Sequence, residues 1–298
     1  MSTTLPPRHL LLAVLAVFIW GTNFVVIKVA LHALPPLLFA ALRFTLASLP
    51  FLMWLPRPKT AWRLIAAAGL FIGVGQFGLL FIAMRADISP GLASLLIQTQ
   101  VFFTLVLAAV LMHERVRVWQ IAGLTIAACG IAVIGFHVDA STTPLGIALV
   151  LGAALCWALG NVATKRAGAV DMVAFTIWSS AFAVVPLYLL SFLIEGPAAM
   201  AAGLAHADLT VWGAVAWQAL GNTIVGYGIW NWLLARHAAG VVTPMALLVP
   251  VFGMGASALW LGEPLLVWKL VAAGLVLAGI AVAILWPRLR PLRAAQSR

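Results

Sequence analysis

The sequence predicts an all-α integral membrane protein of ten transmembrane helices, built as two inverted five-helix repeats around a central cavity. Three observations support this prediction. First, the 298 residues are 64% hydrophobic and only 8% charged, with a mean hydropathy of +1.13, whereas a soluble domain carries about 25% charged residues. Second, the apolar residues fall into ten runs, each close to the ~20 residues that cross a bilayer. Third, the two halves of the chain repeat short motifs in the same order.

The ten runs are separated by prolines and short polar stretches, which leave no room for a soluble domain. The first run is too long for a signal peptide and has no small-x-small cleavage site, so we expect an uncleaved first helix. The predicted spans are 9–31, 35–55, 62–84, 89–112, 117–136, 144–165, 171–194, 209–235, 241–261 and 266–286.

Basic residues predict the orientation. With the N-terminus in the cytoplasm, most of the 17 lysines and arginines fall at cytoplasmic span ends and loops, Arg57, Lys59 and Arg63 among them. The opposite loops carry acidic residues such as Asp139 and Glu195. This positive-inside bias predicts both termini in the cytoplasm of a bacterial-type inner membrane. Because the net charge of +10 is explained by topology, we expect a lipid bilayer around the chain and no nucleic-acid partner.

Matching motifs indicate an internal duplication. Val-Trp-Gln at 118–120 matches Val-Trp-Lys at 267–269, and Gly-Ile-Ala-Val occurs at both 130–133 and 279–282. Both pairs are separated by the same number of residues, as expected if the second half copies the first.

The duplication sets the expected domain boundaries. We expect a first repeat over residues 1–138 and a second over 139–298. Because each repeat has an odd number of spans, the second must enter the membrane upside down. Inverted repeats can exchange conformations around one central site, as in many transporters.

Segments in both halves resemble the EamA family of the drug/metabolite transporter superfamily. They are Phe-Ile-Trp-Gly-Thr-Asn-Phe at 18–24, Leu-Cys-Trp-Ala at 155–158, and Glu114 and Glu263 after spans four and nine. The chain is also similar to bacterial amino-acid exporters of this family, including exporters of aromatic amino acids. The resemblance implies a ten-helix basket lined mainly by spans three, four, eight and nine. It also implies export of small organic metabolites by alternating access.

Polar side chains within the spans are the candidate site residues, because such groups are costly unless they face protein or water. Aromatic rings beside amides suit an amphipathic solute, since rings offer contact area and cation–π attraction. The same amide and glycine stripes also join helices to one another, so both interpretations stay open. The candidates for substrate binding are Gln76, Gln98, Trp157, Asn161, Trp178, Gln218, Asn222 and Trp230, and those for substrate binding or gating are Trp20, Asn23, Arg43 and Tyr227.

The residues Gln218, Asn222 and Trp230 recur at four-residue steps, which would place them on one face of an α-helix. That face would either line the cavity or pack against a neighbouring helix. Arg43 would either attract a substrate carboxylate or serve as a structural residue that snorkels or pairs with backbone carbonyls.

The acidic residues bear on energy coupling. All seven lie at or near span ends or in loops, and none occupies the membrane midplane, where proton relays are found. We therefore expect facilitated diffusion or exchange. Proton-coupled drug/metabolite efflux, through Glu114 or Glu263, is the alternative.

Other functional classes lack their signatures. His113-Glu114 has no second histidine four positions later, so no metalloprotease motif is present. Cys129 and Cys156 lie within apolar runs, where we expect them to fill space. We expect no catalytic residues, metal or cofactor, and the absence of an ATP-binding motif predicts no ATPase partner. A channel usually forms from a symmetric oligomer around a polar pore, whereas this chain has an internal repeat and scattered amides. We therefore expect a carrier of a small-molecule substrate, as a monomer, with an oligomer as the alternative.

Overall fold

The computed structural model describes residues 5–112, 117–139, 141–237 and 239–289. Helices account for most of the described chain, beside isolated β-bridges that pair Thr142 with Ile88 and with Asp139. The elements are α1 (Pro7–Ala30), α2 (Pro36–Leu52), α3 (Trp62–Ala68), η1 (Gly69–Gly78), α4 (Leu79–Ala86), α5 (Pro90–Leu96), η2 (Ile97–Thr99), α6 (Gln100–Met112), α7 (Val118–Gly135), α8 (Pro144–Arg166), α9 (Met172–Leu190), η3 (Ser191–Glu195), α10 (Pro197–His206), α11 (Leu209–Ala216), η4 (Trp217–Gly226), α12 (Tyr227–Arg236), α13 (Ala239–Val242), η5 (Thr243–Leu247), α14 (Leu248–Leu261) and α15 (Val267–Leu289).

Local sequence explains where several helices begin and end. Proline occupies the first turn of α1, α2, α5, α8 and α10. Proline has no backbone N–H, and a backbone N–H in the first turn would have no hydrogen-bond partner within the helix. Gly262 ends α14 with a φ of 67°, in the left-handed conformation that glycine adopts without steric cost.

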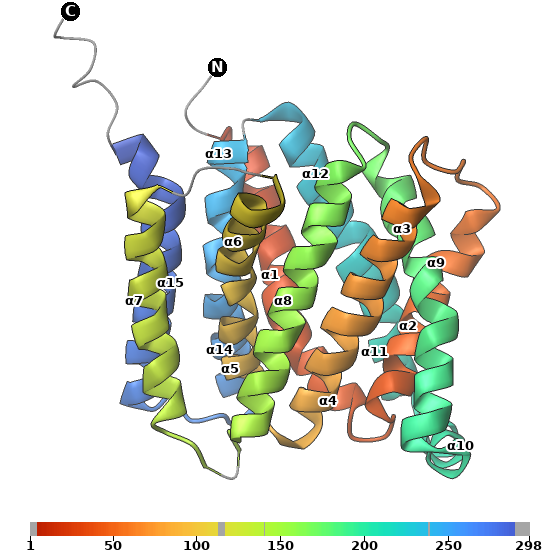
Figure 1. The fold of residues 1–298 in the computed structure, drawn as a ribbon. Coiled ribbons are helices and arrows are strands. Elements are labelled where there is room, and N and C mark those ends of the chain that lie inside the picture. Colours follow the sequence, from red (N-terminus) through yellow and green to blue (C-terminus); the bar gives the residue numbers. More distant parts are fainter. Residues whose placement is uncertain (1–4, 113–116, 140, 238, 290–298) are drawn as a thin grey trace, which may run out of the picture.

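The helices stand side by side and run between two ends of the molecule (Figure 1). The start of α1, the end of α15 and the α8–α9 connection lie at one end, which we call the terminal end. The α4–α5 connection and α10 lie at the other, the α10 end. In the described residues, eight helices are long and apolar enough to cross a membrane. The all-helical class is therefore confirmed.

The remaining two predicted spans are also helical. Pro36–Leu52 is a shorter apolar helix of 17 residues, and α11, η4 and α12 follow one another over 209–236. The count of ten spans stays a prediction. The short helix α10 occupies a segment predicted to be loop.

Three described segments are π-helical, with wider turns than an α-helix. Two of them, η1 at Gly69–Gly78 and η4 at Trp217–Gly226, lie within spans, and the third, η3, ends the span that begins with α9. In η1, a Cβ atom on Gly69 would collide with the backbone carbonyl of Ser179, so glycine permits the close approach of α9. Segments of this kind inside α-helices are often found at functional sites.

The helices pack in a defined set of pairs. α7 packs along α15 at one side of the molecule (Figure 1), α2 along α9, and α5 along α14. α1 contacts α14 and η4, while α8 contacts α6 and η1.

At the α10 end, two carboxylates each close the N-terminus of a helix that lies far away in the sequence. Glu195 accepts hydrogen bonds from the backbone N–H groups of Leu37 (2.7 Å) and Leu38 (3.1 Å) at the start of α2. Glu263 accepts from the Ser89 hydroxyl and from the Gly91 N–H (3.0 Å) at the start of α5, and it pairs with Lys269 at 2.9 Å. Carboxylates at these positions satisfy free N–H groups and interact favourably with the helix dipole. Glu114 and His113 lie outside the described residues.

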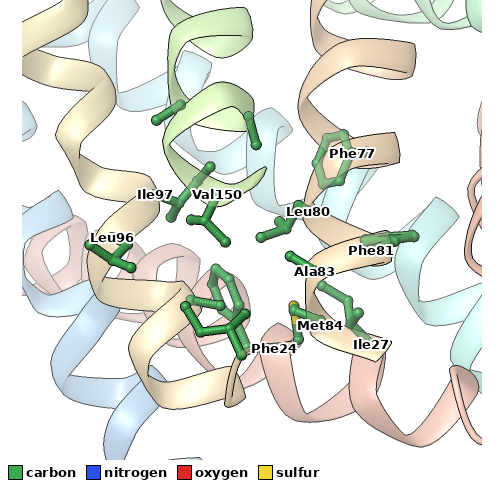
Figure 2. Close-up of a cluster of buried hydrophobic side chains, with 14 of the residues drawn as sticks. Phe24, Ile27, Phe77, Leu80, Phe81, Ala83, Met84, Leu96, Ile97 and Val150 are labelled. Carbon is green, nitrogen blue, oxygen red and sulfur yellow. The ribbon is translucent and has the colours of Figure 1, made fainter. Parts of the chain in front are cut away.

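A buried apolar cluster fills the space between α1, α4, α5 and α8 towards the α10 end. Figure 2 shows its side chains converging from these helices, with Phe24 and Ile27 from α1 and Leu80 and Met84 from α4. Ile27, Leu80 and Met84 are almost completely buried. The cluster separates the interior of the molecule from this end.

Candidate functional site

A central cavity of about 600 Å³ lies between the helices. Phe24, Ile27 and Leu80 of the buried apolar cluster form one boundary. From there the lining extends to Ala68, where α3 continues into η1, and to Met172, the first residue of α9, which begins at the terminal end. Ligand pockets for small organic molecules are commonly ~300–1,000 Å³ in volume. The cavity can therefore hold a solute of amino-acid size.

Three aromatic residues form one wall of this cavity. The Trp20 ring centroid lies 5.1 Å from those of Tyr227 and Trp230. The Trp20 Nε1–H donates to the backbone carbonyl of Asn222 at 3.4 Å, which joins α1 to η4. The wall offers apolar contact area and ring faces that attract cations.

An amide and hydroxyl network forms a second wall. The Asn161 Nδ2 group of α8 donates to Gln100 Oε1 of α6 at 3.1 Å, and the Thr104 hydroxyl donates to the same oxygen at 3.3 Å. Gln98 Nε2 donates to the Ala246 carbonyl at 3.1 Å. These bonds hold the amides in place at the cavity surface.

Arg43 of α2 also borders the cavity, although its side chain is only 1% exposed. Its Nη2 group donates to the Thr223 hydroxyl at 3.0 Å, and that hydroxyl donates to the Gln218 carbonyl at 3.0 Å. The guanidinium carbon lies 3.8 Å from the ring centroid of Phe77 and 4.7 Å from that of Phe44. The arginine is thus fixed between η1 and η4.

Several polar atoms at the cavity have no hydrogen-bond partner in the described part of the chain. They are Arg43 Nε and Nη1, Asn23 Oδ1 and Gln76 Oε1. Buried polar groups are nearly always paired in folded proteins. These atoms therefore hold unused hydrogen-bonding capacity at the cavity wall, although each of them is buried in this conformation.

All but two of the candidate site residues line the cavity. Gln76, Gln98, Trp157, Asn161, Asn222, Trp230, Trp20, Asn23, Arg43 and Tyr227 border it. Trp178 lies elsewhere, with its Nε1–H donating to the Leu55 carbonyl at 3.1 Å and its ring packed against Trp62. Gln218 is fully buried away from the cavity. That the lining residues bind substrate stays a prediction.

The lining also includes polar residues that were not among the candidates predicted from the sequence. They are Gln100, Thr104, Thr164, Thr176, Ser179, Ser180 and Thr223. Thr176, Ser179 and Ser180 follow three- and four-residue steps on α9, so their spacing predicts a shared face. The cavity is also bordered by more elements than spans three, four, eight and nine, since α1, α2, α8, α9 and α15 contribute.

The charge of the lining is simple. Among the described lining residues, Arg43 is the one charged side chain, and no carboxylate accompanies it. The described residues also contain no group of three or more His, Cys, Asp or Glu side chains that could hold a metal ion.

Comparisons with known proteins agree with this architecture. A model of the EamA-like transporter family matches residues 8–136 and 144–285. A probable amino-acid metabolite efflux pump of Salmonella typhimurium (strain LT2) is 39% identical over 289 residues, covering 94% of this chain and 95% of the relative. A probable amino-acid metabolite efflux pump of Escherichia coli (strain K12) is 38% identical over 289 residues, with the same coverage. One solved crystal structure, 20% identical, covers 98% of this chain and 100% of its own with a TM-score of 0.63, which shows the fold alone.

Proposed function

Because this chain belongs to the EamA-like transporter family, we propose that it exports amino acids, aromatic ones included, by alternating access around the central cavity. The chain is a membrane exporter of small metabolites. The amino-acid substrate class is supported by the two relatives described as amino-acid metabolite efflux pumps.

The observation that carries the proposal is the chemistry of the cavity. It combines a cationic group, Arg43, with neutral amides and an aromatic wall at Trp20 and Trp230. An amino acid has a carboxylate, an ammonium group and a side chain, and each has a complementary partner here. A zwitterion that leaves water must recover hydrogen bonds, because an unpaired buried polar group costs ~1–3 kcal/mol. We propose that the candidate residues lining the cavity supply these bonds.

Helix packing supports ten spans in two inverted repeats over 1–138 and 139–298. A Cβ atom on Gly130 of α7 would meet the Ala272 carbonyl of α15, and one on Gly279 of α15 would meet the Gly123 carbonyl of α7. Residues 130 and 279 are matched positions of the two halves, and so are 123 and 272. The α7–α15 interface is therefore reciprocal, as a two-fold relation between the repeats requires.

The same relation recurs around the cavity. η1 packs against α8 in the way that η4 packs against α1. We propose that the carrier acts as a monomer, because the internal repeat supplies both halves of the cavity from one chain.

We place the terminal end in the cytoplasm of the inner membrane, from the distribution of basic residues. The apolar cluster and the two carboxylate caps then lie towards the outside. The cavity lining extends instead towards the cytoplasm, as expected for an inward-facing state of an alternating-access carrier.

We further propose that the carrier needs no ion gradient. No acidic residue lies among the described lining residues, and Glu263 uses its oxygens to close α5 and to pair with Lys269. Downhill movement or exchange of the solute therefore suffices.

Counterflow in proteoliposomes tests the proposal. Vesicles containing only this protein are loaded with one unlabelled amino acid at a time, and entry of the same labelled amino acid is measured at symmetric pH and salt. We expect transient accumulation for a subset of the panel, aromatic members included. Absence of counterflow for all amino acids would refute the substrate class, and accumulation only under an imposed proton gradient would refute uncoupled transport.

A further inference from the structure

We propose that Arg43 makes a carboxylate the required group of the substrate, whereas the substrate's amine binds only to neutral groups and can be replaced. This inference rests on the proposed transport of amino acids. It extends that proposal by defining which part of the molecule is selected.

The first reason is the unused hydrogen-bonding capacity of Arg43. Its Nη2 group donates to Thr223, while Nε and Nη1 have no partner in the described chain. Leaving these N–H groups unpaired is costly in a buried site. A carboxylate is the group that best matches a guanidinium, because its two oxygens accept charge-assisted hydrogen bonds.

The second reason is that Arg43 is held in position. The guanidinium stacks on Phe77 and lies near Phe44, and the Thr223 hydroxyl holds one nitrogen. At 1% exposure the side chain does not reach an aqueous surface by snorkelling. The binding group is therefore preorganised, which lowers the entropic cost of ligand binding.

The third reason is the absence of a counter-ion. No carboxylate lies among the described residues of the cavity lining. A solute that brings a negative charge neutralises Arg43, whereas a solute without one leaves a buried cation unpaired, which is strongly unfavourable.

An ammonium group finds a different environment. The partners that the cavity wall holds for it are neutral: the buried, unpaired acceptors Asn23 Oδ1 and Gln76 Oε1, and the ring faces of Trp20 and Trp230. A hydroxyl group can donate to the same acceptors. The site should therefore accept α-hydroxy acids as well as α-amino acids, and should reject amino-acid amides and decarboxylated amines.

Competition against counterflow tests this selectivity on the wild-type protein. The reference is the panel amino acid with the strongest counterflow. Its competitors are the unlabelled amino acid, the α-hydroxy acid with the same side chain, the carboxamide and the decarboxylated amine. We expect half-inhibition by the hydroxy acid within about fivefold of the amino acid, and by the carboxamide and amine at concentrations about 10- to 100-fold higher.

Variants then identify the residue responsible. Arg43→Gln should weaken inhibition by the amino acid while leaving inhibition by the carboxamide unchanged. The ratio of their half-inhibition concentrations should therefore fall to about one. Arg57→Gln removes an exposed arginine that stacks on Trp62 outside the cavity, and it should keep the wild-type ratio. If Arg43→Gln transports too slowly, the ligand-induced rise in Tm of the purified protein reports the same ratio.

The outcomes separate this inference from the function on which it rests. Equal competition by acid and carboxamide in the wild type would overturn carboxylate selection while leaving amino-acid transport intact. An unchanged ratio in Arg43→Gln, or an equal loss for both ligands, would assign Arg43 a structural role. Absence of counterflow for every amino acid would reject both proposals together.

Discussion

Two amides one turn apart on η4 have different surroundings. Asn222 is 4% exposed and borders the cavity, and its backbone carbonyl accepts the Trp20 indole N–H. Gln218 is 0% exposed, and neither its Oε1 nor its Nε2 has a hydrogen-bond partner in the described chain. The Asn222 side chain is therefore placed to contact a solute, whereas the unpaired Gln218 side chain lowers the stability of the folded protein.

This contrast predicts opposite effects of two substitutions. Gln218→Met keeps the side-chain size and removes two unpaired polar atoms, which cost ~1–3 kcal/mol when buried, so Tm should rise while the half-saturation constant stays unchanged. Asn222→Ala should raise the half-saturation constant about fivefold, because losing one typical hydrogen bond costs about 1 kcal/mol of binding free energy. Tm and counterflow are measured on the same purified preparations. A fall in Tm for Gln218→Met, or unaltered affinity for Asn222→Ala, would contradict these assignments.

The sequence predicted that Gln218, Asn222 and Trp230 share one face, and the structure shows why only two of them border the cavity. The prediction assumed α-helical steps, whereas residues 217–226 form a π-helix with hydrogen bonds from i to i+5. The wider turn changes the direction of residues four apart. Trp178 was selected for its depth in the span, but depth does not determine which side of α9 a residue occupies. That side depends on tertiary packing against Trp62 and Leu55.

Among the elements, α7 and α15 show how glycine sets helix spacing. Gly123 and Gly279 face each other, and a Cβ atom on either would collide with the backbone carbonyl of the other. Gly274 lies on the same helix as Gly279, and a Cβ atom there would meet nothing within 4 Å. Small residues at membrane helix interfaces permit such close approach.

We therefore expect Gly279→Ala to separate the two helices and to lower stability by ~1–3 kcal/mol, as overpacking does. Gly274→Ala is the matched control, because it adds the same methyl group in open space and improves helix propensity by up to about 1 kcal/mol. Thermal unfolding in detergent should give a lower Tm for Gly279→Ala and an equal or higher Tm for Gly274→Ala. Equal stability of the two variants would mean that the close contact between Gly279 and Gly123 does not affect the free energy of unfolding.

Hydropathy predicted the positions of the long helices because each apolar run must satisfy its backbone hydrogen bonds internally in lipid. Hydropathy could not predict that η1 and η4 are π-helical. An apolar run has the same hydropathy whether its backbone forms α-helical or π-helical hydrogen bonds. Hydropathy also missed α10, an alanine-rich segment that begins at Pro197 and lies in a predicted loop.

Across the whole molecule, the cavity is closed towards one end and continues towards the other. Towards the α10 end, buried apolar side chains from α1, α4, α5 and α8 close the interior (Figure 2), and Glu195 and Glu263 close the N-termini of α2 and α5. Towards the terminal end the lining continues to Thr164, Met172 and Thr176. We therefore propose that solute enters from the terminal end and leaves after the α10 end opens.

Blocking the cavity from the cytoplasmic side tests whether the solute passes through it. In a background without Cys129 and Cys156, Thr176→Cys places a thiol on the cavity lining, and Thr60→Cys places one in the loop before α3, outside the lining. Inside-out vesicles are treated with a bulky, membrane-impermeant thiol reagent, and uptake of the transported amino acid is then measured.

We expect both cysteines to react, only Thr176→Cys to lose transport, and excess substrate to slow the reaction of Thr176→Cys alone. An unreactive Thr60→Cys would contradict the cytoplasmic placement of the terminal end. Full modification of Thr176→Cys with undiminished transport would show that the solute does not pass through this cavity.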